Sequence, residues 1–125
     1  MKYLGVDWGL KKIGLAVSEG DIASPLGVLE IKSLKDGVEK IIKVCKKEEI
    51  HLAVLGKPGG NIGKKVEKAV KILKKSGLKI ETADETLSTQ KAKTAMIGLG
   101  FSQKARREDN AMAAAIILQD YLDTL

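Results

Sequence analysis

Aromatic residues are scarce in this sequence. One Trp, two Tyr and one Phe make up 3% of its 125 residues, so the hydrophobic core must be built from aliphatic side chains. The single cysteine, Cys45, excludes an intrachain disulfide, and with one histidine it argues against a zinc site. No stretch is long and apolar enough to span a bilayer, and the N-terminus lacks the apolar segment of a signal peptide. We therefore expect a cytoplasmic protein that has no membrane partner.

Lysine and arginine outnumber the acidic residues by 22 to 16, which gives a formal net charge of +6. A basic chain favours acidic partners, of which nucleic acid is the usual one, although the same charge also serves solubility. The length fits one domain, residues 1–125, which is large enough to bury a core. Composition therefore leaves two alternatives, a nucleic-acid-binding protein and an ordinary soluble domain.

The order of apolar patterns predicts an α/β fold. Short β-prone runs with few residues between them predict an antiparallel meander of three strands, and alternating helices and strands follow. The predicted strands are Tyr3–Asp7, Ile13–Ser18, Gly27–Ile31, Leu52–Leu55 and Lys79–Ala83. The predicted helices are one around Val38–Cys45 with Ser33 as its N-cap, one from about Ile62 to Ser76 after a loop at Gly56–Gly63, one from Thr89 to about Gly98, and one from Asp109 to about Leu122. The result is a five-stranded mixed sheet with helices on both faces.

Three acidic residues stand where an open α/β sheet binds its ligands. Asp7 ends the first strand, Glu85 follows the fifth strand beside Asp84, and Asp109 begins the last helix, where the helix dipole favours a carboxylate. Converging carboxylates repel one another unless a cation lies between them. Two Mg²⁺ or Mn²⁺ ions about 3.5–4 Å apart could hold the water and the leaving oxygen of a phosphodiester there. Each acid also has a plainer explanation, as a turn residue or a helix cap, and spacing alone does not show that the three meet.

Basic residues in the predicted loops could contact the phosphates of a nucleic acid around such a site. They are Lys11, Lys12, Lys57, Lys104, Arg106 and Arg107. Contacts of this kind give salt-dependent binding that does not depend on base sequence. The lysines of the second predicted helix are better explained as a solvated face, and Trp8 as a packing residue rather than one that stacks on a base.

Four motifs, in order along nearly the whole chain, resemble the YqgF family of Holliday junction resolvases and pre-16S rRNA processing nucleases. They are the opening hairpin from Tyr3 to Ser18, the segment Val54–Pro58, the acidic strand end Asp84–Thr89, and the C-terminal helix Asp109–Leu122. The resemblance implies an RNase H-like fold and a nucleic-acid partner, either structured RNA or branched DNA. It also implies Mg²⁺ or Mn²⁺ as cofactor, bound by the catalytic acids Asp7, Glu85 and Asp109.

On this basis we predict a divalent-metal-dependent endonuclease, a monomer or weak homodimer, that processes the 5′ end of pre-16S rRNA, resolves Holliday junctions, or does both. The chain departs from the family pattern at Thr86, where Arg is usual, at Lys57, where an aliphatic residue is common, and in a shorter loop at Gly59–Gly63. These departures leave open a catalytically weak nucleic-acid-binding module with the same fold. A third class, an ATP-binding or phosphotransfer protein, shares Asp-x-Gly near the N-terminus, but such proteins usually need a second domain.

Overall fold

The first three strands form the antiparallel meander that their short spacing predicts. In the computed structural model, β1 spans Tyr3–Trp8, β2 Lys12–Ser18 and β3 Ser24–Glu30. The structure describes residues 1–57, 60–84 and 109–125, with Asp84 and Asp109 described by their backbone only. The predicted helix from Thr89 to about Gly98 therefore lies outside the described residues.

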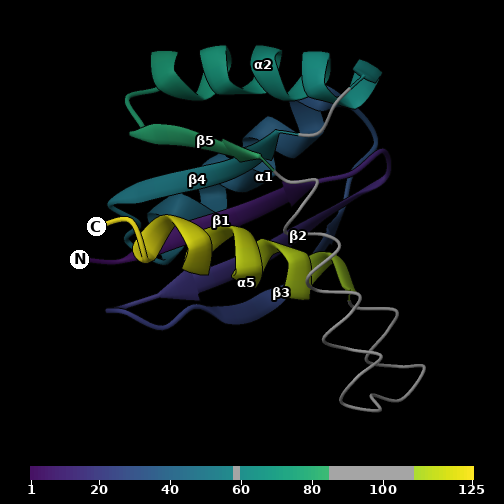
Figure 1. The fold of residues 1–125 in the computed structure, drawn as a ribbon. Helices are drawn as coiled ribbons and strands as arrows, with labels where there is room; N and C mark the ends of the chain where they lie inside the picture. The colour runs from purple at the N-terminus through teal and green to yellow at the C-terminus, as the bar shows by residue number, and fades with distance from the viewer. Residues whose placement is uncertain (58–59, 85–108) are drawn as a thin grey trace.

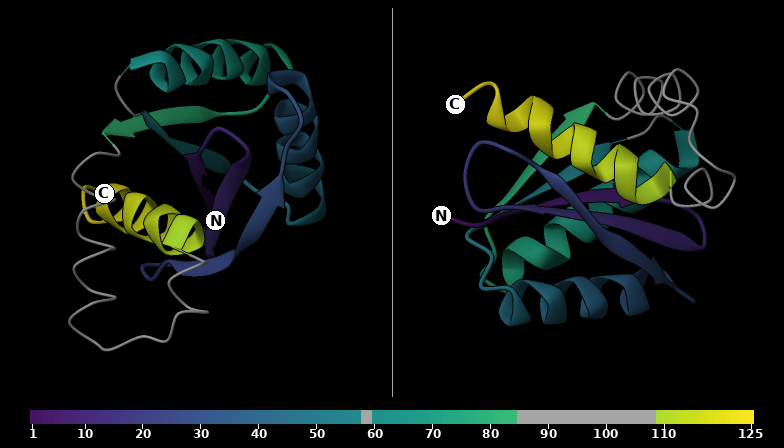
Figure 2. Two further views of the ribbon diagram at one scale, coloured as in Figure 1. Left: turned by 90° about the vertical axis from the view of Figure 1, so that its right-hand side faces the viewer. Right: turned by 90° about the horizontal axis from the view of Figure 1, so that it is seen from below.

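Two parallel strands complete the sheet on the other side of β1. They are β4 (Leu52–Lys57) and β5 (Ile80–Asp84), and the strand order is β3-β2-β1-β4-β5. Two helices, α1 (Leu34–Lys47) and α2 (Gly60–Lys75), cover one face, and α5 (Asp109–Leu122) lies on the opposite face (Figures 1 and 2). The predicted five-stranded mixed sheet with helices on both faces is thus confirmed. Of the helices that the structure describes, none combines the length and the apolarity needed to cross a bilayer.

The start of α1 and the end of α2 lie close to where the sequence predicts them. The Oγ of Ser33 accepts a hydrogen bond from the backbone N–H of Asp36 at 3.1 Å, and the Asp36 carboxylate accepts one from the backbone N–H of Lys32 at 2.9 Å. This reciprocal cap satisfies backbone donors at the start of α1. Gly77 follows α2 with a φ of 96°, the left-handed conformation that commonly ends a helix.

Two predicted boundaries are wrong. β3 begins at Ser24 instead of Gly27, because the ladder with β2 continues past an irregularity at Leu15/Ala16 and pairs Pro25 with Ala16. Proline is tolerated there because β3 is an edge strand. The predicted loop at Gly56–Gly63 is also much shorter, because β4 continues to Lys57, paired with Asp84 of β5, and α2 begins at Gly60.

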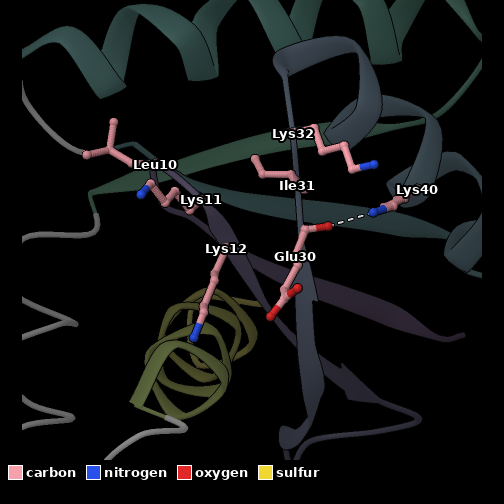
Figure 3. Close-up of a pocket in the computed structure, with 7 residues that line it drawn as sticks. All are labelled: Leu10, Lys11, Lys12, Glu30, Ile31, Lys32 and Lys40. Carbon is pink, nitrogen blue, oxygen red and sulfur yellow. Dashed lines mark hydrogen bonds between the residues drawn. The ribbon is translucent and has the colours of Figure 1, made fainter.

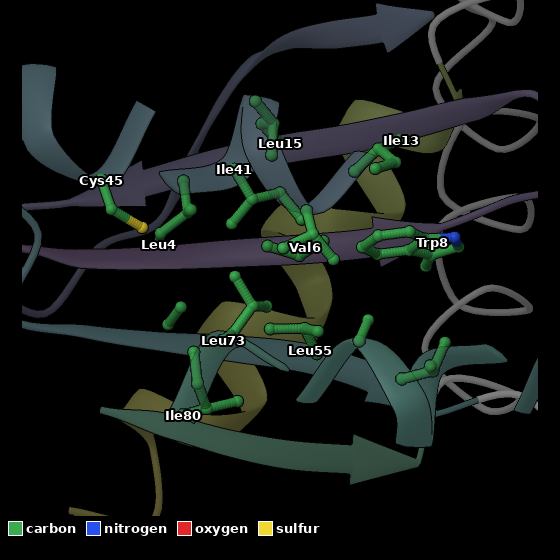
Figure 4. Close-up of a cluster of buried hydrophobic side chains, with 14 residues drawn as sticks. Leu4, Val6, Trp8, Ile13, Leu15, Ile41, Cys45, Leu55, Leu73 and Ile80 are labelled. Atoms are coloured by element: carbon green, nitrogen blue, oxygen red, sulfur yellow. The ribbon is translucent and has the colours of Figure 1, made fainter. Parts of the chain in front are cut away.

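A large aliphatic core fills the space between the sheet and the two helices α1 and α2 (Figure 4). Its fully buried members include Leu4, Ile13, Ile41, Leu55 and Leu73. Trp8 (2% exposed) also packs in this core, close to Gly37 of α1, which confirms its packing role. Cys45 is buried in the same cluster, and desolvation raises the pKa of its thiol to about 11, so the thiol stays protonated at neutral pH.

On the opposite face the layer between helix and sheet is thinner, because α5 packs almost directly on the backbone of β1 and β2. A Cβ added to Gly5 would lie 2.5 Å from the backbone oxygen of Ala114 and 2.7 Å from the Cβ of Leu118. A Cβ added to Gly14 would overlap the backbone carbonyl of Asn110, in the first turn of α5. These two glycines therefore fix how closely α5 approaches the sheet.

We expect Gly14→Ala to destabilise the fold by about 1–3 kcal/mol or more, because the atom it meets belongs to a backbone that cannot rotate away. Urea unfolding measures this loss. Gly27→Ala is the matched control, since Gly27 lies on the neighbouring strand with nothing within 4 Å of an added Cβ. It should leave stability unchanged or raise it slightly. Equal effects of the two substitutions would contradict the close approach of α5.

The α1 cap predicts a pH dependence of stability. The hydrogen bond from the Lys32 N–H, with smaller contributions from Lys40, lowers the pKa of Asp36 below its ordinary 3.8. A depressed folded-state pKa contributes stability that is present above 3.8 and is lost as the pH falls through the folded value.

Asp36→Ala should therefore destabilise the protein at about pH 7, and the difference from the parent should shrink at about pH 2.5. Chemical unfolding at the two pH values tests this expectation. Glu39→Ala, on the same helix, controls for the loss of one negative charge. A difference between Asp36→Ala and the parent that persists unchanged in acid would contradict the role of the ionised cap.

Candidate active site

Asp7 lies near the carboxyl end of β1, on the face of the sheet that α5 covers. Side chains alternate along a strand, so Leu4, Val6 and Trp8 enter the α1/α2 core, whereas Gly5 and Asp7 face the other way. The contact of Gly5 with α5 identifies that second face. Asp7 is only 6% exposed, and acidic residues are almost never buried unless they are paired. The strand therefore holds a buried carboxyl group in a fixed position at the sheet's edge.

The start of α5 reaches the same position. Asp7 is paired across the ladder with Gly14, and Gly14 lies against the backbone of Asn110 and Ala111. Asp109 is the first residue of α5, directly before this contact. The structure thus brings the β1 acid next to the helix start that carries the second predicted acid, although 101 residues separate them in the sequence.

β5 leads toward this edge as well. Gly56, which follows the β4 residue paired with Val6, is itself paired with Ala83. Ala83 packs against the α5 cluster, so it lies on the same face of the sheet as Asp7. The third predicted acid, Glu85, lies outside the described residues, two positions after Ala83.

The donors in this region suit a hard divalent cation. Carboxylate oxygens are the ligands that Mg²⁺ and Mn²⁺ prefer, and a glycine at position 14 leaves the strand and the helix start in close contact. Within residues 1–57, 60–84 and 109–125, no cluster of three His, Cys, Asp or Glu side chains could hold a metal ion. The predicted ligand set also contains Glu85 and the Asp109 side chain, which lie outside the described part of the chain.

A basic groove of about 540 Å³ lies where the β1–β2 turn meets the connection from β3 to α1 (Figure 3). The backbone N–H of Ile31 donates to the carbonyl of Lys11 at 2.9 Å, which joins the two segments. Lys40 contributes from α1, where its Nζ donates to the backbone oxygen of Glu30 at 2.6 Å and pairs with Asp36 at 3.2 Å. The lining residues are Leu10, Lys11, Lys12, Glu30, Ile31, Lys32 and Lys40.

The structure separates the basic residues that the sequence predicts. Lys12 alternates with Ile13, which enters the α1/α2 core, so Lys12 shares the α5 face with Asp7, and Figure 3 shows its side chain directed to that side. Lys57 lies on the other face, where its Nζ pairs with the Glu67 carboxylate of α2 at 2.7 Å. That hydrogen bond lowers the pKa of Glu67. Lys104, Arg106 and Arg107 lie outside the described residues.

Sequence reasoning missed Lys32 and Lys40 as neighbours of Lys11 and Lys12. The pairing of β2 with β3 could have revealed these neighbours. It places Lys12 opposite Glu30 and so brings the residues that follow β3 beside the β1–β2 turn. Finding it required the position of β3, whose predicted start was wrong by three residues.

The chain has relatives along its whole length. A family model described as "RuvX: Holliday junction resolvase" matches residues 1–124. A protein of Clostridium novyi named "Putative pre-16S rRNA nuclease" is 36% identical, and the match covers 100% of both chains. A protein of the same name from Dictyoglomus turgidum is also 36% identical, over 100% of this chain and 96% of its own.

Solved structures show the same fold at low sequence identity. RuvC of T. thermophilus in complex with a Holliday junction substrate matches with a TM-score of 0.67 and 14% identity, over 99% of this chain and 96% of its own. The fowlpox virus Holliday junction resolvase matches with a TM-score of 0.69 and 13% identity, over 99% of both chains. The fold is therefore that of RuvC-like resolvases, and the chain belongs to the RuvX/YqgF family.

Proposed function

We propose that this protein is a divalent-metal-dependent endonuclease that hydrolyses phosphodiester bonds in structured nucleic acid, with Asp7, Glu85 and Asp109 as its catalytic acids. The observation that carries the proposal is the placement of Asp7. A chain of the RuvX/YqgF family buries this carboxyl group at the carboxyl edge of β1, beside the start of α5. Open α/β sheets bind their ligands at this edge.

The three acids are the residues that would hold Mg²⁺ or Mn²⁺. When bound, such ions activate the attacking water and neutralise charge on the leaving oxygen. The protein's part is to hold the acids on rigid elements, since Asp7 belongs to a central strand and Asp109 to a helix packed on that strand. The α5 N-terminus adds the positive end of a helix dipole near the phosphate.

Lys11 and Lys12 are proposed to hold the phosphate backbone beside the acids. Lys12 is an exposed residue on the Asp7 face, and the basic groove with Lys32 and Lys40 continues from it toward α1. Lysine contacts to phosphates fix the position of a strand without reading its bases. A substrate could thus run from the groove to the acids.

Processing of the pre-16S rRNA 5′ end is the favoured role, since relatives 36% identical over this whole chain bear that nuclease name. Resolution of branched DNA is the second, supported by the family description. A junction resolvase must make paired cuts, which would favour a homodimer, whereas an RNA-trimming enzyme could act as a monomer. The proposed rRNA role places the protein in the cytoplasm, where ribosomes assemble.

We expect Asp7→Asn to lower the cleavage rate roughly 100-fold or more while keeping most of the affinity for nucleic acid, because it removes a metal-binding charge without changing the shape of the side chain. Cleavage of ribosomal precursor RNA and of four-way DNA junctions, with Mg²⁺ or Mn²⁺, measures the rate. Asp21→Asn is the matched control, because Asp21 is an exposed acid in the β2–β3 turn.

The proposal fails if the parent protein cuts neither substrate with either ion, or if Asp7→Asn cuts as fast as the parent. Salt-dependent binding without cleavage would instead identify a nucleic-acid-binding module that keeps the fold. Calorimetric titration with ATP separates the remaining class, since tight ATP binding would favour a phosphotransfer protein.

A further inference from the structure

The excess of positive over negative charge in this chain is concentrated on one helix and the residue Lys57. Lys57 and α2 contain seven of the 22 basic residues and one of the 16 acidic residues, which gives this segment a net charge of +6. The other 15 basic and 15 acidic residues balance one another. The whole formal charge of the protein therefore resides on Lys57 and a single helix, all of whose lysines are exposed.

Four of these lysines form a line along the outermost edge of α2. The helix buries Val66, Ala69 and Leu73 completely, and the positions farthest from that face are all lysine. With steps of four, three and four residues, the line extends about 16 Å at 1.5 Å per residue. We call it the lysine crest, and it consists of Lys64, Lys68, Lys71 and Lys75.

Folding requires a polar outer face on α2, but it does not explain why the outermost positions are all lysine. Neighbours three or four residues apart on a helix repel one another when their charges are alike. Among the ion pairs of the described residues, the one that involves α2 joins its single acid, Glu67, to Lys57. Glu67 also attracts Lys71 and Lys64, but it is one acid among six lysines of the helix. By contrast, α1 pairs Lys40 with Asp36 four residues before it. A polyanionic partner would relieve the repulsion along α2.

The chemistry of α2 indicates which polyanion fits. Membrane-surface helices insert an apolar face into lipid, but the apolar face of α2 is buried in the core and Ile72 is its one large exposed apolar side chain. The helix has no aromatic residue on which unpaired bases could stack. A row of lysines can bind phosphates without contacting bases, which suits a double-helical segment whose bases are paired and stacked inside.

The lysine crest and Asp7 lie on opposite sides of the sheet. The buried side of α2 packs in the core cluster that contains Leu4 and Val6, and Asp7 alternates with these residues along β1 and so faces the other side of the sheet. The ribbon views show α2 and α5 on these two opposite faces (Figure 2). A phosphate at the acids therefore cannot contact the crest. A long substrate could contact both sites with two different segments.

We propose that the lysine crest binds the phosphate backbone of a double-helical segment that flanks the cleavage site. The nucleic-acid identity of this partner rests on the proposed function. The crest supplies affinity and no chemistry, so its loss weakens binding and leaves the maximal cleavage rate unchanged.

The test compares two triple variants of the full chain. Lys64→Gln/Lys68→Gln/Lys71→Gln removes most of the crest, and Lys43→Gln/Lys46→Gln/Lys47→Gln removes three exposed lysines of α1. Each lowers the net charge by three, so any effect of overall charge is shared. Fluorescence anisotropy at several salt concentrations measures binding to precursor RNA with a long or a trimmed helical flank, and circular dichroism checks folding.

The crest variant should bind the long-flank RNA roughly tenfold or more weakly, with a salt slope smaller by about 2–3, and its deficit should shrink on the trimmed RNA. The α1 variant should change little. Equal losses in both variants, or no loss in the crest variant, would overturn the proposal. So would crest-dependent binding to phosphatidylserine vesicles with none to RNA.

Cleavage separates this proposal from the proposed function. If the parent cuts RNA and the crest variant has the same KM and kcat, the crest proposal fails and the nuclease assignment stands. If the parent cuts nothing but crest-dependent RNA binding remains, the nuclease assignment fails and the crest proposal stands.

Discussion

The contact between α5 and the two central strands is the constraint on which the candidate site depends. It is a contact between backbones, because Gly5 and Gly14 have no side chains to separate the helix from the sheet. Gly14 is also the residue paired with Asp7 across the β1–β2 ladder. The glycine that allows α5 to approach the sheet therefore lies directly beside the acid. The packing of α5 on the sheet therefore also sets the geometry of the candidate site.

The two faces of the sheet serve different purposes. The α1/α2 face holds the large aliphatic core, in which Leu4, Ile41 and Leu73 are fully buried, and this core provides most of the hydrophobic stabilisation. The α5 face holds a second, smaller cluster that combines small side chains such as Ala16 with large ones such as Leu118. On this face, the end of β1 carries a buried carboxyl group instead of another apolar side chain.

Most of the fold follows from local patterns in the sequence. Ser33 and Gly77 mark helix ends through backbone hydrogen bonding and a positive φ, and the run Ala111–Leu118, apolar over most of its surface, defines α5. These signals depend on neighbouring residues, so they can be recognised without the structure. The start of β3 could not, because Pro25 opposes a strand locally and only the pairing with Ala16 overrides that preference.

The sequence predicts which residues belong to the site but not how they are arranged in space. Asp7 could be recognised from its strand-end position, whereas its proximity to the start of α5 depends on contact between Gly14 and Asn110, far apart in the sequence. For Lys57 the predicted position was wrong. A loop position would have placed it beside the catalytic acids, but Lys57 belongs to β4, and alternation along the strand turns its side chain toward Glu67 on the other face. The face that Lys57 occupies depends on β4 extending two residues beyond its predicted end at Leu55.

The outer edge of β3 has a consequence for how molecules of this protein meet. An uncovered strand edge can extend a sheet into a neighbouring chain and so begin aggregation. Here Pro25 offers no N–H to an incoming strand, and the irregularity at Leu15/Ala16 bends the ladder beside it. Gln119 of α5 also holds the adjoining turn through the N–H of Ala23 and the carbonyl of Asp21. Copies of the chain are thereby discouraged from joining into a continuous intermolecular sheet along β3.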